Sequence, residues 1–139
     1  MQPLPRRLAV VRAIDTNIIV RFLTRDDKDQ AKKAHAIIGD GDLFIATSVM
    51  LESEWVLRSA YGFSSSEITS ALRSVAGLPG IILEDALLLA QALEWTDLGM
   101  DFADALHLAR ARDCDAFFTF DKRLAKAAGL VSDTKVIVP

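Results

Sequence analysis

The stretch of sequence that decides the fold reads Val10-Val11-Arg12-Ala13-Ile14-Asp15-Thr16-Asn17. Its apolar run predicts a buried strand over residues 9–14, and the polar side chains that follow open a helix over residues 16–23. A strand that passes directly into a helix, with a carboxylate at the junction, is typical of the repeating units of an α/β protein. Asp15 is therefore the starting point for both the fold and the chemistry.

The same alternation continues to the end of the chain. Further strands are predicted over residues 43–46, 81–83, 116–120 and 135–138, and helices over residues 28–38, 47–61, 64–76, 85–97, 101–112 and 122–128. Strands separated by helices indicate a mostly parallel central sheet of about five strands, flanked by helices on both faces. We expect a single domain over residues 9–139, preceded by a flexible lead-in over residues 1–8.

Composition excludes several classes of protein. The 139 residues are 51% hydrophobic and 25% charged, with a formal net charge of −3, which suits one globular domain. No apolar run approaches the roughly 18 residues that a bilayer requires, so no membrane association is expected. A single cysteine, Cys114, excludes an internal disulfide and suits a cytoplasmic protein. The two histidines, His35 and His107, do not form a zinc motif.

Four carboxylates stand at positions where a soluble fold has little reason to place them. Asp15 and Asp121 each end an apolar strand, and Glu52 and Asp104 lie inside apolar helical patterns. Carboxylates gathered by folding repel one another, and burial is costly unless they are protonated, paired or bound to a cation. Four oxygen donors without histidine or cysteine suit Mg²⁺ or Mn²⁺, which can activate water for phosphodiester hydrolysis.

Each of these carboxylates also has an ordinary structural interpretation. Asp15 and Asp121 are equally suited to cap the helices that follow them. Glu52 could pair with a distant arginine, whereas its neighbour Glu54 lies four residues before Arg58, the spacing of a solvent-exposed helical ion pair. Both interpretations stay open at this stage.

Four segments in series resemble the PIN-domain nucleases, and among them the VapC-type toxins of bacterial toxin–antitoxin pairs. The resemblance lies in the segments Ile14-Asp15-Thr16-Asn17, Leu51-Glu52-Ser53-Glu54-Trp55-Val56-Leu57-Arg58 with Tyr61-Gly62 after it, Asp101-Phe102-Ala103-Asp104-Ala105-Leu106, and Thr119-Phe120-Asp121-Lys122. They occur in the order typical of the family and span nearly the whole chain.

The resemblance implies an acidic quartet at Asp15, Glu52, Asp104 and Asp121 that binds Mg²⁺ or Mn²⁺ and cleaves RNA. It also implies frequent homodimers and inhibition by a partner antitoxin. Polar residues beside the quartet are expected to support the site, namely Thr16, Asn17, Asp101 and Thr119. Two features depart from the family pattern, because the segment before the first strand is long and Asp101 adds a fifth acid.

Basic residues near the predicted acids are candidates for contacts with RNA phosphates. They are Arg21, Arg25, Lys122 and Arg123, with Lys126 one turn further on. The alternative for each is a solvated side chain on a helix exterior.

Two other functions fit part of the pattern. A haloacid-dehalogenase-like phosphatase would use Asp15 as a covalent nucleophile, but it normally has a second aspartate at the position of Asn17. A response-regulator receiver fits less well, because it needs paired acids after the first strand and a late lysine. A non-catalytic domain of the same fold, which binds RNA or protein, is the remaining alternative.

Overall fold

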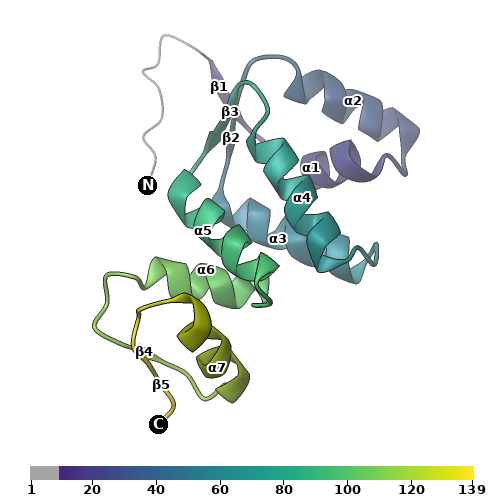
Figure 1. The fold of residues 1–139 in the computed structure, drawn as a ribbon. Helices are drawn as coiled ribbons and strands as arrows, with labels where there is room; N and C mark the ends of the chain where they lie inside the picture. The colour runs from purple at the N-terminus through teal and green to yellow at the C-terminus, as the bar shows by residue number, and fades with distance from the viewer. Residues whose placement is uncertain (1–9) are drawn as a thin grey trace. The chain divides into compact units, whose positions relative to one another are not determined.

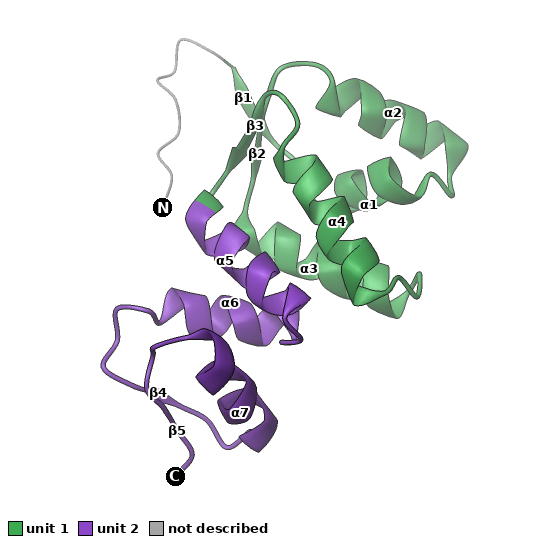
Figure 2. Ribbon diagram, in the orientation of Figure 1, with its two compact units in different colours: residues 1–86 green, residues 87–139 purple. Residues whose placement is uncertain are grey.

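The computed structural model describes residues 10–139, which form two compact units (Figures 1 and 2). The first unit ends at Ala86 and the second spans Leu87–Pro139. Each unit is described by itself below. The lead-in predicted over residues 1–8 lies outside the described residues.

The first unit alternates strands and helices in the order β1, α1, α2, β2, α3, α4, β3. Its three strands pair in parallel in the order β1–β2–β3, with Ala13 opposite Phe44 and Phe44 opposite Ile82. Helix α1 packs against both α2 and α3. The bounds are Val11–Ala13 (β1), Thr16–Thr24 (α1), Lys28–Ile38 (α2), Asp42–Ile45 (β2), Thr47–Ser59 (α3), Ser65–Ala76 (α4) and Ile81–Leu83 (β3).

The second unit contains three helices and a pair of short strands. Helix α5 starts at the last residue of the first unit, and β4 and β5 pair in parallel with Phe117 opposite Val136. The bounds are Ala86–Asp97 (α5), Phe102–Arg110 (α6), Phe117–Phe118 (β4), Lys122–Val131 (α7) and Val136–Ile137 (β5).

The α/β class and the parallel strands predicted from the sequence are confirmed. Every predicted helix and strand is present, and the helix predicted over residues 28–38 has those bounds. The five strands pair as one group of three and one group of two. The first strand was predicted to be buried, but Arg12 and Ala13 are exposed, because among the described residues β1 pairs only with β2 and forms an edge.

Both units have a core of apolar side chains. In the first unit Ile19, Leu43 and Leu57 are fully buried, one each from α1, β2 and α3. In the second unit Phe102 and Leu108 of α6 are buried to the same degree. Within residues 10–139, no helix has the length and apolar character needed to cross a bilayer.

A close backbone approach at Gly80 fixes the start of the β2–β3 pairing. Gly80 has φ of +81°, and a Cβ atom there would lie 2.6 Å from the carbonyl oxygen of Gly41. The Gly80 carbonyl accepts a hydrogen bond of 2.8 Å from the backbone N–H of Leu43. Only glycine accommodates both the left-handed backbone and this contact.

We therefore predict that Gly80→Ala destabilises the protein, by roughly 1–2 kcal/mol from the left-handed backbone alone and by more once the contact with Gly41 is included. Gly77→Ala is the matched control, because Gly77 has a negative φ and its added Cβ would lie in ordinary contact at 3.4 Å. Urea denaturation of both variants measures the difference. Equal stability of the two variants would contradict this account of the turn.

Candidate functional site

Parallel pairing in the first unit brings two of the predicted site residues into one network. Asp15 follows β1, and α3 starts directly after β2, so both lie at the carboxyl-terminal edge of the sheet. The hydroxyl of Thr16, which is buried, donates a hydrogen bond to Oε1 of Glu52 in the second turn of α3. Thr16, which the sequence predicted to support the site, therefore contacts one of the predicted acids, Glu52.

Asp15 caps helix α1. Its Oδ1 atom accepts a hydrogen bond of 3.2 Å from the backbone N–H of Ile18. Asp15 is exposed, as is Asn17 two residues later. The cap uses one carboxylate oxygen and leaves the other available to a ligand, so the capping role and a ligand role for Asp15 do not exclude each other.

The two glutamates of α3 differ in environment, but in the opposite sense to the sequence interpretation. Glu54 is only 6% exposed, although it forms the expected ion pair with Arg58, at 2.9 Å between Oε2 and Nε. Glu52 is exposed. The prediction of a solvent-exposed Glu54 was therefore wrong. The pair with Arg58, as predicted, compensates the charge of Glu54, and Glu52 accepts a hydrogen bond from a neutral hydroxyl.

Glu84 is a site-edge residue that sequence reasoning missed. The N-cap position of α3 is Ala46, which has no capping side chain. The Oε1 atom of Glu84 instead accepts a hydrogen bond of 2.8 Å from the backbone N–H of Thr47. Glu84 follows β3, so a carboxylate at the end of the third strand caps the backbone N–H at the start of α3, the helix that follows β2.

In the second unit, three aspartates line a single cavity of about 660 Å³. Asp101 and Asp104 come from the start of α6, and Asp121 precedes α7. Arg123 and Lys126 line the same cavity from α7. The structure thus brings together the two quartet members of this unit and the fifth acid that departs from the family pattern.

Two of these aspartates also cap helices, with one oxygen each. Oδ2 of Asp101 accepts from the backbone N–H of Asp104 at 3.2 Å. Oδ1 of Asp121 accepts from the N–H groups of Arg123 and Leu124, at 2.9 and 3.1 Å, and the hydroxyl of Thr119 accepts from the N–H of Asp121 at 3.0 Å. Within the described residues, the second oxygen of each aspartate has no hydrogen bond.

Asp104 is the electrostatically unusual member of the group. It is half-buried, and within residues 10–139 its carboxylate has no hydrogen-bond or ion-pair partner. Burial raises the pKa of the Asp104 carboxyl above its ordinary value, and the negative charges of Asp101 and Asp121 act in the same direction. The nearby His107 acts against them and lowers the pKa. A cation in the cavity would offset the repulsion between the carboxylates of Asp101, Asp104 and Asp121.

The donor chemistry of these residues fits a hard divalent cation, because every candidate ligand is a carboxylate oxygen. Among the described residues, however, no group of three or more His, Cys, Asp or Glu side chains is close enough together to hold a metal ion. Neither unit by itself therefore supplies a complete set of ligands. Asp15 and Glu52 belong to the first unit, and Asp104 and Asp121 belong to the second.

The basic residues predicted to contact RNA have different surroundings. The guanidinium of Arg21 donates to Asp26 at 2.8 Å, to Gln30 at 2.7 Å and to the hydroxyl of Tyr61 at 3.0 Å, so it joins α1 to the chain around it. Arg123 lines the acidic cavity, and Lys122 is exposed beside it. Arg25 ends α1 in a left-handed conformation and lines a separate cavity.

Comparison with known proteins identifies the family. A family model described as PIN domain matches residues 12–130, which include parts of both units. The chain belongs to the PIN-domain family. The matched segment contains every residue of the predicted acidic quartet, and the resemblance drawn from the sequence motifs is thereby confirmed at the level of the family.

Two solved structures are similar to this chain. Mycobacterium tuberculosis VapC20, described as a toxin that cleaves the sarcin-ricin loop, is 18% identical with a TM-score of 0.42, over 85% of this chain and 95% of that one. VapBC2 from Rickettsia felis, bound to a DNA fragment from its promoter, is 14% identical with a TM-score of 0.38, over 93% and 98% of the two chains. No curated protein sequence matches this chain.

The surroundings of Asp104 predict a pH-dependent stability in the absence of metal. Because the folded-state pKa is raised, the folded protein binds this proton more tightly than the unfolded chain, and stability falls as pH rises above the ordinary value of 3.8. Asp104→Asn removes the charge, so we expect it to melt at a higher temperature than wild type at pH 7 in EDTA, with the gain shrinking towards pH 3.

Asp133→Asn, at an exposed position, is the control and should leave the melting temperature nearly unchanged at both pH values. Thermal melts followed by circular dichroism provide the measurement. A lower melting temperature for Asp104→Asn at pH 7 would show that the Asp104 carboxylate stabilises the fold, against this account.

Proposed function

We propose that this protein is a divalent-metal-dependent endoribonuclease, the toxin component of a toxin–antitoxin pair. The observation that carries the proposal is the cavity of the second unit, which three aspartates of a PIN-domain chain line and where one of them, Asp104, has a raised pKa and no partner among the described residues. A perturbed carboxylate in a cavity is a feature of functional sites, because structural acids are normally paired.

The proposed ligands are Asp15, Glu52, Asp104 and Asp121. The chain prepares each carboxylate for this role. The hydrogen bond from Thr16 orients Glu52, and the caps made by Asp15 and Asp121 fix the position of each carboxylate through one oxygen. Asp101 adds negative charge beside Asp104 and so strengthens the attraction of the cavity for a cation.

A bound Mg²⁺ or Mn²⁺ would supply a water of lowered pKa for attack on the phosphorus and a positive charge for the departing oxygen. The products of such a hydrolysis carry 5′-phosphate and 3′-hydroxyl ends. Arg123 and Lys126, on the wall of the same cavity, are placed to bind the phosphate of the RNA beside the acids. Thr119 and Asn17 are proposed as supporting polar groups.

The toxin assignment rests on the four sequence motifs in series. It implies an antitoxin partner that covers the acidic residues, a homodimer, and a cytoplasmic location where RNA is available. The domain is proposed to extend over residues 9–139, as expected from the sequence.

The first test is cleavage of RNA by the purified protein. We expect Mn²⁺-dependent cleavage of total RNA, which Asp15→Asn and Asp104→Asn should reduce by at least 100-fold, because each removes one charged ligand of the ion. Gel electrophoresis of end-labelled RNA measures the rate and shows whether the products carry 5′-phosphates.

Asp29→Asn is the matched control, because Asp29 is an exposed acid on α2 outside the proposed set. It should retain wild-type activity. Full activity in excess EDTA would overturn the metal dependence. A covalent phospho-aspartate at Asp15, trapped with an acyl phosphate mimic, would instead favour the phosphatase alternative. Absence of any cleavage, with RNA binding intact, would favour the non-catalytic binding module.

The second test is thermal stability with metal. Because a cation relieves the mutual repulsion of the acids in the folded state only, millimolar Mn²⁺ should raise the melting temperature of wild type. The rise should shrink in Asp104→Asn and persist in Asp29→Asn. Differential scanning calorimetry at pH 7 measures the shift, and a melting temperature that is the same with Mn²⁺ and with EDTA would count against the proposed site.

A further inference from the structure

A second cavity, of about 300 Å³, lies in the first unit, and its lining is basic. It is formed by Arg25 at the end of α1 and by Lys28, Ala31, Lys32 and His35 of α2, and is called the basic hollow below. The lysines are four residues apart and His35 follows three residues after Lys32, so one face of α2 presents them together. The small side chain of Ala31 leaves room between them.

The cations of the basic hollow have no carboxylate partner among the described residues. Arg25, Lys28 and Lys32 take part in no ion pair there. The nearby acids are engaged elsewhere, since Asp26 binds Arg21 and Tyr61, and Asp27 caps α2 through the N–H of Gln30. Asp29 lies on α2 but forms no ion pair with either lysine. Three like charges thus remain uncompensated around one cavity.

Two details argue that this arrangement is shaped for a ligand. Arg25 has a φ of 56°, a conformation that glycine adopts at less cost at the end of a helix, so an arginine here places a cation at some expense of backbone energy. The Nε2 atom of His35 contacts the backbone carbonyl oxygen of Phe22 at 3.2 Å, and the centroids of the His35 and Phe22 rings lie 4.1 Å apart. These two contacts fix the position of His35 in the wall of the hollow.

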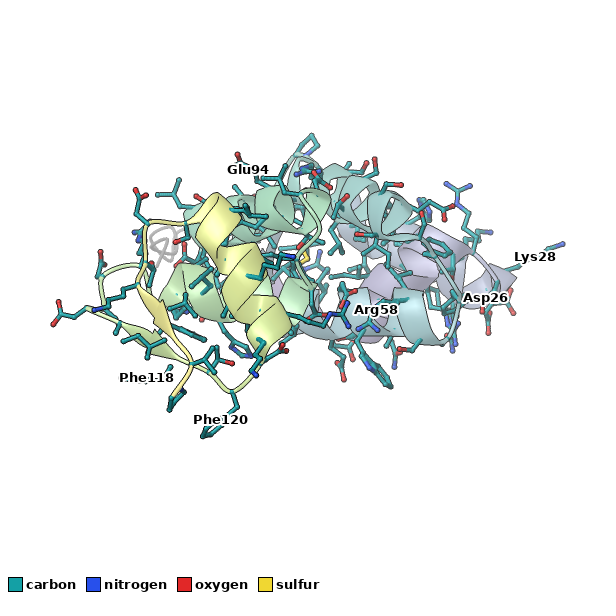
Figure 3. All side chains as sticks on the ribbon, turned by 60° about the horizontal axis from the view of Figure 1, so that its bottom comes forward. Asp26, Lys28, Arg58, Glu94, Phe118 and Phe120 are labelled. Carbon is teal, nitrogen blue, oxygen red and sulfur yellow. The ribbon has the colours of Figure 1, made fainter. Side chains whose placement is uncertain are left out.

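We propose that the basic hollow binds backbone phosphates of the RNA substrate outside the point of cleavage. This inference rests on the proposed function and adds a second contact region to it. Uncompensated lysine and arginine side chains around a cavity are the common form of a phosphate contact, and they fix the position of the nucleic acid without reading its sequence. Figure 3 shows Lys28 extending outward from the start of α2.

The distance between the hollow and the acids of the same unit suits an RNA strand. Asp15 caps the start of α1 and Arg25 ends it, nine helical residues later. Arg25 follows Asp15 by ten residues, so at 1.5 Å per residue the separation is roughly 15 Å, which is the axial advance of about four nucleotides along one strand of a duplex. An RNA stem held at the hollow could therefore reach the acidic residues at the other end of α1.

The experiment compares two neighbouring lysines of α2. Both are exposed, but Lys32 lines the hollow, whereas Lys33 lies about 100° further round the helix and does not line it. Lys32→Glu and Lys33→Glu change the net charge by the same amount. Binding of a fluorescent RNA hairpin is measured by anisotropy in EDTA, so that metal-dependent cleavage does not interfere, over a range of salt concentrations.

We expect Lys32→Glu to weaken RNA binding several-fold more than Lys33→Glu. The double variant Lys28→Ala/Lys32→Ala should lower the slope of log affinity against log salt by about 1.4 for single-stranded and 1.8 for duplex contacts, one increment for each lost phosphate contact. Inorganic phosphate, added over the same range of concentrations as the salt, should compete only weakly with the RNA hairpin if the hollow binds an RNA backbone. Circular dichroism melts establish that all variants are folded.

Equal losses for Lys32→Glu and Lys33→Glu would overturn the proposal, because they would reflect only the general charge of the protein. Unchanged RNA affinity in Lys32→Glu, with loss of binding to an acidic protein partner, would also overturn it. The proposed nuclease function fails separately. If RNA binding depends on the hollow but no cleavage occurs with Mn²⁺, the nuclease proposal is wrong and the phosphate-binding proposal is retained. If Mn²⁺-dependent cleavage occurs but RNA binding does not depend on the hollow, only the phosphate-binding proposal is wrong.

Discussion

The parallel pairing of β1, β2 and β3 is the constraint on which the first unit depends. With Ala13, Phe44 and Ile82 side by side, the three strands end at one edge, and everything that follows them must share that edge. The hydrogen bond from Thr16 to Glu52 joins the helices that follow the first and second strands. These two residues are 36 positions apart in the sequence, and they meet because the parallel pairing of β1 and β2 brings the starts of the following helices to the same edge of the sheet.

The two interpretations of the aspartates, helix cap or metal ligand, are compatible in the structure. Asp15, Asp101 and Asp121 each accept a hydrogen bond through one oxygen from a backbone N–H at the N-terminus of a helix, and within the described residues the other oxygen has no hydrogen bond. The cap also has a functional value. It holds the carboxylate in one orientation, so the binding of an ion to the second oxygen costs less conformational entropy of the side chain. Asp104 makes no cap of this kind, and burial, together with the negative charges of Asp101 and Asp121, raises the pKa of its carboxyl.

The sequence was sufficient for features that depend on neighbours along the chain. The alternation of apolar and helical patterns predicted the bounds of α2 and α4 closely. It failed where a distant residue decides the outcome. Glu84 caps a helix that starts 37 positions earlier, and Glu54 is buried by packing that its spacing from Arg58 does not reveal. Convergence of the whole quartet, which the family resemblance implies, stays a prediction.

A chain with a net charge of −3 that is proposed to cleave RNA with a metal ion must attract a polyanion although its proposed ligands are carboxylates. The first unit separates these tasks along α1. Asp15 and the Thr16–Glu52 pair lie at the start of the helix, and the uncompensated cations of the basic hollow lie at its end and on α2. At physiological salt the Debye length is about 8 Å, shorter than the helix, so each end presents its own potential to an approaching strand. The hollow can therefore bind phosphates although the protein as a whole is acidic, and its contribution should be the part of RNA binding most sensitive to salt.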